Sequence, residues 1–88
     1  MHMALQNTLT VGINNNYLGV VTNSTTQLIV KILDVHGRFI KTMKKTLEQG
    51  VHECCINLDE LAEGNYVVNT FNGEIFVRSI KYIKGKLA

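Results

Sequence analysis

The chain has 88 residues, which is enough for one domain with a single hydrophobic core and too few for a second. Apolar residues make up 45% of the sequence and charged residues 18%, a composition that excludes intrinsic disorder. The formal net charge of +2 does not by itself indicate a nucleic-acid or membrane surface. Because the sequence shows neither a membrane-spanning run nor a signal-peptide pattern, we expect an intracellular protein or a segment of a longer one.

Short apolar stretches rich in Val, Ile, Thr, Tyr and Phe alternate with Asn, Gly, Ser and Asp along the whole chain. This rhythm is typical of strands joined by turns, and helical spacing is not sustained for three turns anywhere. It predicts an all-β fold, a small antiparallel β-sandwich of about seven strands that is immunoglobulin-like. The predicted strands are Leu5–Ile13, Tyr17–Thr22, Gln27–Val35, Arg38–Thr46, Val51–Leu58, Asn65–Phe71 and Glu74–Ile83.

These strands define a single β-sandwich domain over residues 5–84. Residues 1–4 are interpreted as start or vector-derived residues without fold information, and residues 85–88 as a short tail. The strand Arg38–Thr46 has one largely solvated face, which is typical of the edge of a sheet.

Glycines mark the predicted turns. Asn72-Gly73 and His36-Gly37 each separate two strands, and we expect both pairs to close tight hairpins, because such turns need residues that tolerate positive φ. Asp59 is placed to cap a short helical turn or loop that ends at Gly64.

The residues that most often carry catalysis or bind metals are sparse. Cys54 and Cys55 are neighbours on a strand, so they point to opposite faces, and we expect one buried and one exposed thiol without a disulfide. His52 and Cys54 share a face, but no further ligand or orienting group accompanies them. Asp59, Glu60 and Glu63 are interpreted as a solvated turn rather than an acid–base pair. We therefore predict no enzyme activity, no metal or other cofactor, no small-molecule substrate and no nucleic-acid partner.

Three features follow one another in a fixed order: the turn Asp34-Val35-His36-Gly37-Arg38, then Gly50, then the segment from Leu58 to Tyr66. A final hairpin with the basic strand Phe76 to Lys81 follows them. This ordered set resembles the type A C-terminal sorting domain of the type IX secretion system, as found in secreted proteins of Bacteroidetes. Members of that family have a "YDxxGR" turn, a glycine, an "IDLSxLxxGxY" segment and a closing lysine-rich strand. Where they usually carry Asn-Pro in the first turn, this chain has Asn14-Asn15-Asn16.

The resemblance implies a targeting module that is carried by a passenger domain in the same chain and recognised by the outer-membrane secretion machinery. It also implies a protein that is secreted or displayed on the cell surface after passing through the periplasm. The residues that match the sorting motif are Asp34, Gly37, Arg38, Gly50, Leu61, Gly64, Tyr66, Lys81 and Lys84.

The residues themselves suggest physical roles that agree with this resemblance. Leu61 is expected to anchor the segment after the fifth strand, and Tyr66 to enter the core with its hydroxyl free to meet a backbone partner. An immunoglobulin-like or fibronectin-like binding, adhesion or spacer module is the alternative function, because sandwiches of this kind host many unrelated activities.

Overall fold

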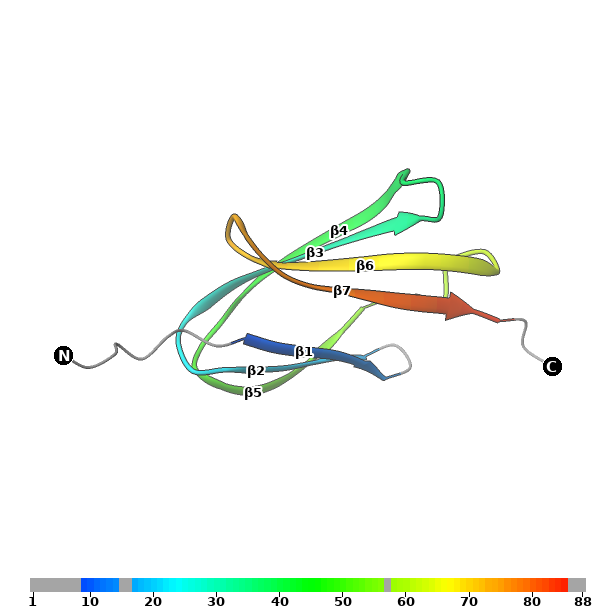
Figure 1. Ribbon diagram of the computed structural model, residues 1–88. Coiled ribbons are helices and arrows are strands. Elements are labelled where there is room, and N and C mark those ends of the chain that lie inside the picture. The colour runs from blue at the N-terminus through cyan, green and yellow to red at the C-terminus, as the bar shows by residue number, and fades with distance from the viewer. Residues whose placement is uncertain (1–8, 15–16, 57, 86–88) are drawn as a thin grey trace.

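The computed structural model describes residues 9–14, 17–56 and 58–85, which form seven strands and no helix (Figure 1). The strands are β1 (Leu9–Asn14), β2 (Tyr17–Thr22), β3 (Thr26–Asp34), β4 (Phe39–Leu47), β5 (Gly50–Cys55), β6 (Gly64–Asn72) and β7 (Ile75–Lys84). The all-β prediction is therefore confirmed for the described part of the chain.

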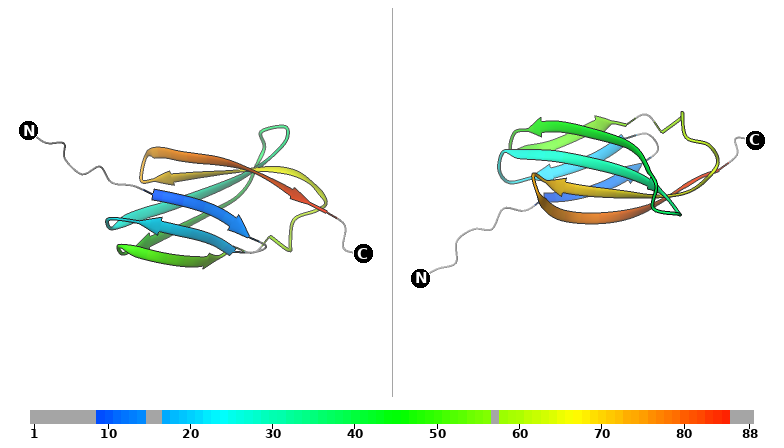
Figure 2. Two further views of the ribbon diagram at one scale, coloured as in Figure 1. Left: turned by 60° about the horizontal axis from the view of Figure 1, so that its bottom comes forward. Right: turned by 90° about the horizontal axis from the view of Figure 1, so that it is seen from above.

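The strands form two antiparallel sheets that face each other as a sandwich (Figure 1). One sheet has the strand order β1-β2-β5, and the other has the order β4-β3-β6-β7. The chain passes from one sheet to the other after β2, after β4 and after β5, as the two views of Figure 2 show. β4 and β7 are the two edges of the larger sheet, which confirms the edge position predicted for the fourth strand.

The core lies between the sheets and is built from alternate residues of the strands, because successive side chains of a strand point to opposite faces. β2 and the first half of β3 show this alternation of buried and exposed positions most regularly. The buried apolar residues include Val11, Leu18, Val20, Leu28, Val30, Ile32, Cys54, Ile56, Leu58 and Val68. Cys54 is buried, Cys55 is exposed and both are free thiols, as expected from their opposite faces.

The predicted strand bounds are close to the observed ones, with one larger error. β2 has the predicted bounds, and most of the others differ by one or two residues at each end. β5 ends at Cys55, three residues before the predicted Leu58, because the chain leaves the smaller sheet there and crosses to the larger one. Three predicted segments lie wholly or partly outside the described residues: the start at 1–4, the first four residues of the predicted first strand, and most of the tail at 85–88.

Both predicted hairpins are present, but neither turn is centred where the sequence suggested. Asn72 pairs with Ile75, so the central residues of the β6–β7 turn are Gly73 and Glu74. The β3–β4 turn is centred on Val35 and His36, and the backbone N–H of Gly37 donates to the carbonyl of Asp34 at 3.0 Å. Each glycine has the positive φ that was expected. Register shifts within both hairpins move the pairing by one residue, and periodicity alone does not reveal such bulges.

The described part of the crossover from β5 to β6, residues 58–63, is a compact loop, which is one of the two forms that the sequence predicted. The backbone N–H of Leu61 donates to the carbonyl of Leu58 at 3.1 Å, which makes one turn that begins at Leu58 instead of at the predicted cap Asp59. Tyr66 is buried, and its hydroxyl donates to the carbonyl of Ala62 at 2.7 Å. This arrangement, known as a tyrosine corner, recurs in immunoglobulin-like sandwiches, and it confirms the backbone partner expected for Tyr66.

Candidate functional site

Most residues of the predicted sorting motif gather at one end of the four-stranded sheet. β3 ends at Asp34, β6 begins at Gly64 and β7 ends at Lys84, and antiparallel pairing places these strand ends side by side (Figure 1). Asp34 pairs with Tyr66, and Gly64 pairs with Lys84. We call this region the motif end and define it as residues 34–39, 58–66 and 81–84.

Gly50 is the one residue of the predicted motif that lies elsewhere. It begins β5 and pairs with Thr22, the last residue of β2, at the opposite end of the sandwich. Its φ of 135° lies in the region that favours glycine, so it serves the turn from β4 to β5. The sequence motif therefore combines one end of the fold with a turn at the other end.

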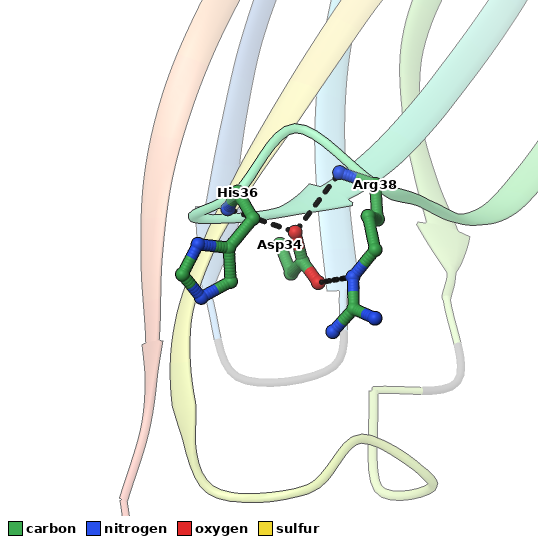
Figure 3. A network of polar contacts seen from close by, with 3 residues as sticks. All are labelled: Asp34, His36 and Arg38. Atoms are coloured by element: carbon green, nitrogen blue, oxygen red, sulfur yellow. Dashed lines mark hydrogen bonds and ion pairs between the residues drawn. The ribbon is translucent and has the colours of Figure 1, made fainter.

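Asp34 organises the β3–β4 turn (Figure 3). Its Oδ1 accepts hydrogen bonds from the backbone N–H groups of His36 and Arg38, both at 2.9 Å, and its Oδ2 pairs with Nε of Arg38 at 3.0 Å. The backbone N–H of Arg38 contributes most to lowering the pKa of the Asp34 carboxyl, against partial burial, which raises it. The carboxylate therefore holds the turn closed, and the guanidinium of Arg38 remains largely exposed.

Two ion pairs join the crossover loop to the edges of the larger sheet. Lys41 of β4 lies 3.6 Å from Glu60, and Lys84 of β7 lies 3.6 Å from Asp59. The side chain of Lys84 is only 16% exposed, so this lysine holds the crossover loop in place, and little of its charge is accessible to a partner. Lys81 is exposed, and its ammonium group makes no hydrogen bond or ion pair with the described residues. The two lysines that the sequence grouped together thus have different surroundings.

A groove of about 290 Å³ opens at the motif end. Most of its lining residues lie on the face of the larger sheet that points away from the core, whereas Tyr66 belongs to the core and Tyr82 packs against it. Val67 pairs with both Leu33 and Lys81, and Leu33 also pairs with Phe39, so one row of side chains crosses all four strands on this face. Residues lining the groove include Val35, Asn65, Val67, Lys81 and Ile83.

Apolar side chains are exposed around this groove, as Val51 and Ile75 are elsewhere on the domain. Val35 is 59% exposed, Phe39 60% and Ile83 73%. Together with Leu33 and Val67 they form what we call the outer-face patch. Sequence reasoning missed these three residues, because an apolar residue in a strand usually indicates a core position. The only signal was that neither face of the last strand is purely apolar.

The side chains that this end presents are mainly apolar and basic. Among the residues that the structure describes, no group of three His, Cys, Asp or Glu side chains is placed to hold a metal ion. His52 lies away from the motif end, and its Nε2 is 2.6 Å from the carbonyl of Glu48. The described part of the chain contains no helix that is long and apolar enough to cross a membrane. An apolar patch rimmed by basic groups is typical of protein–protein contact.

The sequence profile of a family described as "Secretion system C-terminal sorting domain" matches residues 5–84. The chain belongs to the type IX secretion C-terminal sorting domains. The resemblance inferred from the ordered motifs is thus confirmed, and the match also takes in the first two strands, which the motifs did not cover. Membership implies a secreted or cell-surface protein that interacts with the type IX machinery. Comparison with curated proteins found no match, and comparison with solved structures found none.

Proposed function

We propose that this domain is a non-catalytic sorting module that directs a passenger protein in the same chain, by way of the periplasm, to the outer-membrane type IX translocon. The observation that supports this function most is the convergence of the motif. Residues from β3, β6 and β7, which are far apart in the sequence, lie together at one end of the fold. A receptor that reads a folded domain needs its determinants on one surface, and this arrangement supplies one.

The motif divides into residues that build this end and residues that are presented by it. Asp34, Gly64 and Tyr66 belong to the first group, because each fixes the path of the backbone through a bond or a positive φ. Lys81 and the exposed guanidinium of Arg38 belong to the second group. A change in the first group should therefore impair sorting by unfolding the domain, and a change of charge in the second group should impair it while the domain stays folded.

The test is export of a reporter. The whole chain is fused to the C-terminus of a periplasmically targeted fluorescent protein in a bacterium with a type IX system, and the extracellular fraction is measured. We expect the wild-type fusion outside the cell. Gly64→Val should prevent export by misfolding, whereas Lys81→Glu should leave the melting temperature unchanged and reduce export.

The control for charge is Lys44→Glu on β4, which changes another exposed lysine of the same sheet away from the motif end. Its export should match that of the wild type. A folded and stable wild-type fusion that stays in the periplasm would contradict the sorting function and favour a spacer or adhesion module. Equal export of the Lys81 and Lys44 variants would remove the charge of β7 from the signal.

A further inference from the structure

The groove at the motif end adjoins an open strand edge. β7 is ten residues long and, among the described residues, is paired in the sheet with β6 alone. Nη1 of Arg78 donates to the carbonyl of Val11 at 2.7 Å, which holds the middle of β7 against β1. The part from Lys81 to Lys84 lies beyond that contact. An edge strand offers unpaired backbone N–H and C=O groups, to which an extended segment of another protein can add.

The charge of this edge selects the kind of segment that fits. Glu74 is the last acidic residue of the chain, so β7 carries basic residues and no acidic ones. Lys81 is the one charged side chain among the residues that line the groove. Pairing β7 with the same strand of a second copy would bring lysines together, and β4, the other edge of this sheet, also carries three lysines. Like charges directly opposite each other destabilise a strand pair, so an acidic strand is favoured over a second copy.

The pattern of side chains on β7 adds an apolar requirement. Lys81 and Ile83 are two residues apart and therefore lie on the same face of the strand, beside the groove. A neighbouring strand that presents a carboxylate next to Lys81 and an apolar side chain next to Ile83 would complement both. The apolar side chain would also cover part of the outer-face patch, which is otherwise open to water.

We propose that β7, from Lys81 to Lys84, accepts an extended segment of a partner protein that adds to the sheet as a further strand, with acidic and apolar residues alternating on the face it turns to the groove. The biological role of this contact rests on the proposed sorting function, because it names the chemistry of the partner at the same end. The binding itself is measurable without export.

The chain contains matched control positions for this surface. Ile83 and Ile75 are the same residue type on the same strand, and they are 73% and 70% exposed. Ile75 lies beside the β6–β7 turn, at the opposite end of β7 from the groove. Ile83→Ser and Ile75→Ser therefore remove nearly the same exposed apolar surface, and only the first removes it at the groove. For charge, the corresponding test variant is Lys81→Glu and its control is Lys44→Glu.

The probe is a blocked peptide of about eight residues in which every second residue is threonine and the intervening positions alternate glutamate and valine. Glutamate and valine then share one face. Titration into the isotope-labelled full chain, followed by NMR, should give saturable shifts at Val67 and Ile83, slower amide exchange from Lys81 to Lys84, and no change at Ile75. Ile83→Ser and Lys81→Glu should each weaken binding about tenfold, and the two control variants should bind as the wild type does.

Three outcomes would overturn this proposal: no saturable shift, equal binding of a peptide with lysine in place of glutamate, or shifts centred on Ile75. Binding to vesicles of phosphatidylglycerol in place of the acidic peptide would assign the surface to an anionic lipid instead. The result is separable from the sorting function. Export of the wild-type fusion without peptide binding rejects the added strand alone, whereas peptide binding without export rejects sorting and leaves the strand-accepting edge.

Discussion

The two ends of the sandwich are held together by different kinds of interaction. At the motif end, the ion pairs of Arg38, Lys41 and Lys84 fasten the turn and the crossover loop. At the opposite end, most of the side-chain hydrogen bonds join uncharged groups, and the carboxylate of Glu48 accepts one from the hydroxyl of Thr25 at 3.3 Å. The hydroxyls of Thr22 and Thr26 are buried and 2.7 Å apart, and the backbone N–H of Gly73 donates to the carbonyl of Gln27 at 2.9 Å. Protons and salt should therefore affect the motif end more than its counterpart.

Within the motif end, the residues that make the motif recognisable differ from the residues that are exposed to a partner. Asp34, Gly64 and Tyr66 are recognisable in the sequence. In the structure, Asp34 and Tyr66 form hydrogen bonds with backbone groups of neighbouring residues, and Gly64 adopts a positive φ. The exposed groups nearby, Ile83 and Lys81, are ordinary residues of an edge strand. Changes in the first group should alter stability, and changes in the second should alter binding alone.

The largest expected effect compares a glycine at each end. Gly64 has a φ of 148° and Gly73 a φ of 60°, and a Cβ at either position would meet no atom within 4 Å, so only backbone strain is at stake. Gly64→Ala should lower the free energy of unfolding by about 1–3 kcal/mol, because its conformation is almost restricted to glycine. Gly73→Ala should cost about 1–2 kcal/mol, since its left-handed conformation is less restricted.

Asparagine sharpens this comparison, because it tolerates the left-handed region better than alanine does. Gly73→Asn should recover most of the stability that Gly73→Ala loses, whereas Gly64→Asn should recover little. Denaturant unfolding of the four variants provides the measurement. Equal recovery at both glycines would show that the two turns do not differ in the way their φ angles indicate.

A smaller effect is expected from the tyrosine corner. Tyr66→Phe removes the bond to the carbonyl of Ala62 and should lower the free energy of unfolding by about 1 kcal/mol. Tyr82 pairs with Tyr66 across the strands, and its hydroxyl has no hydrogen bond within the described part of the chain, so it is the control. Tyr82→Phe should change stability by less than about 0.5 kcal/mol. Similar losses in the two variants would mean that ring packing, and not the bond, anchors the crossover.

The sequence was informative where local chemistry decides the structure. Short apolar stretches between turn residues predicted all seven strands, and Gly37 and Gly73 marked turns with positive φ. The fixed order of the motifs predicted the family, because several spaced features agree far less often by chance than one does. Tyr66 was predicted to enter the core and to find a backbone partner, and the structure shows both.

The remaining features depend on contacts between distant residues. The bulges next to Leu33 and Phe71 arise from how twisted strands fit together, so the turn centres were misplaced by one residue. Lys81 and Lys84 are three residues apart and so lie on opposite faces of β7, but the ion pair of Lys84 depends on the position of Asp59 in the crossover loop, which the sequence does not give. Similarly, Phe39 and Ile83 resemble core residues until the sheet order shows that their face has no covering layer.

The smallest expected effect tests the charged character of the motif end through Asp34. Its pKa lies below the ordinary value near 3.8. A carboxyl whose pKa is lower in the folded state contributes stability that is fully present above the unfolded pKa and is lost as the pH falls through the folded one. Asp34→Asn keeps an oxygen that can accept the turn's N–H groups, but it neither titrates nor pairs with Arg38.

The variant should therefore be slightly less stable than the wild type near pH 7, and the difference should shrink below about pH 4 and vanish in stronger acid. Thr22→Val is the control at the opposite end: it breaks the uncharged bond to Thr26, so its loss of stability should not depend on pH. Denaturant unfolding at several pH values measures both differences. A gap for Asp34→Asn that stays constant into acid would show that the turn is held by bonds to a neutral oxygen as well as by the carboxylate. The greater share of ion pairs at the motif end would then not account for the stability of the Asp34 turn.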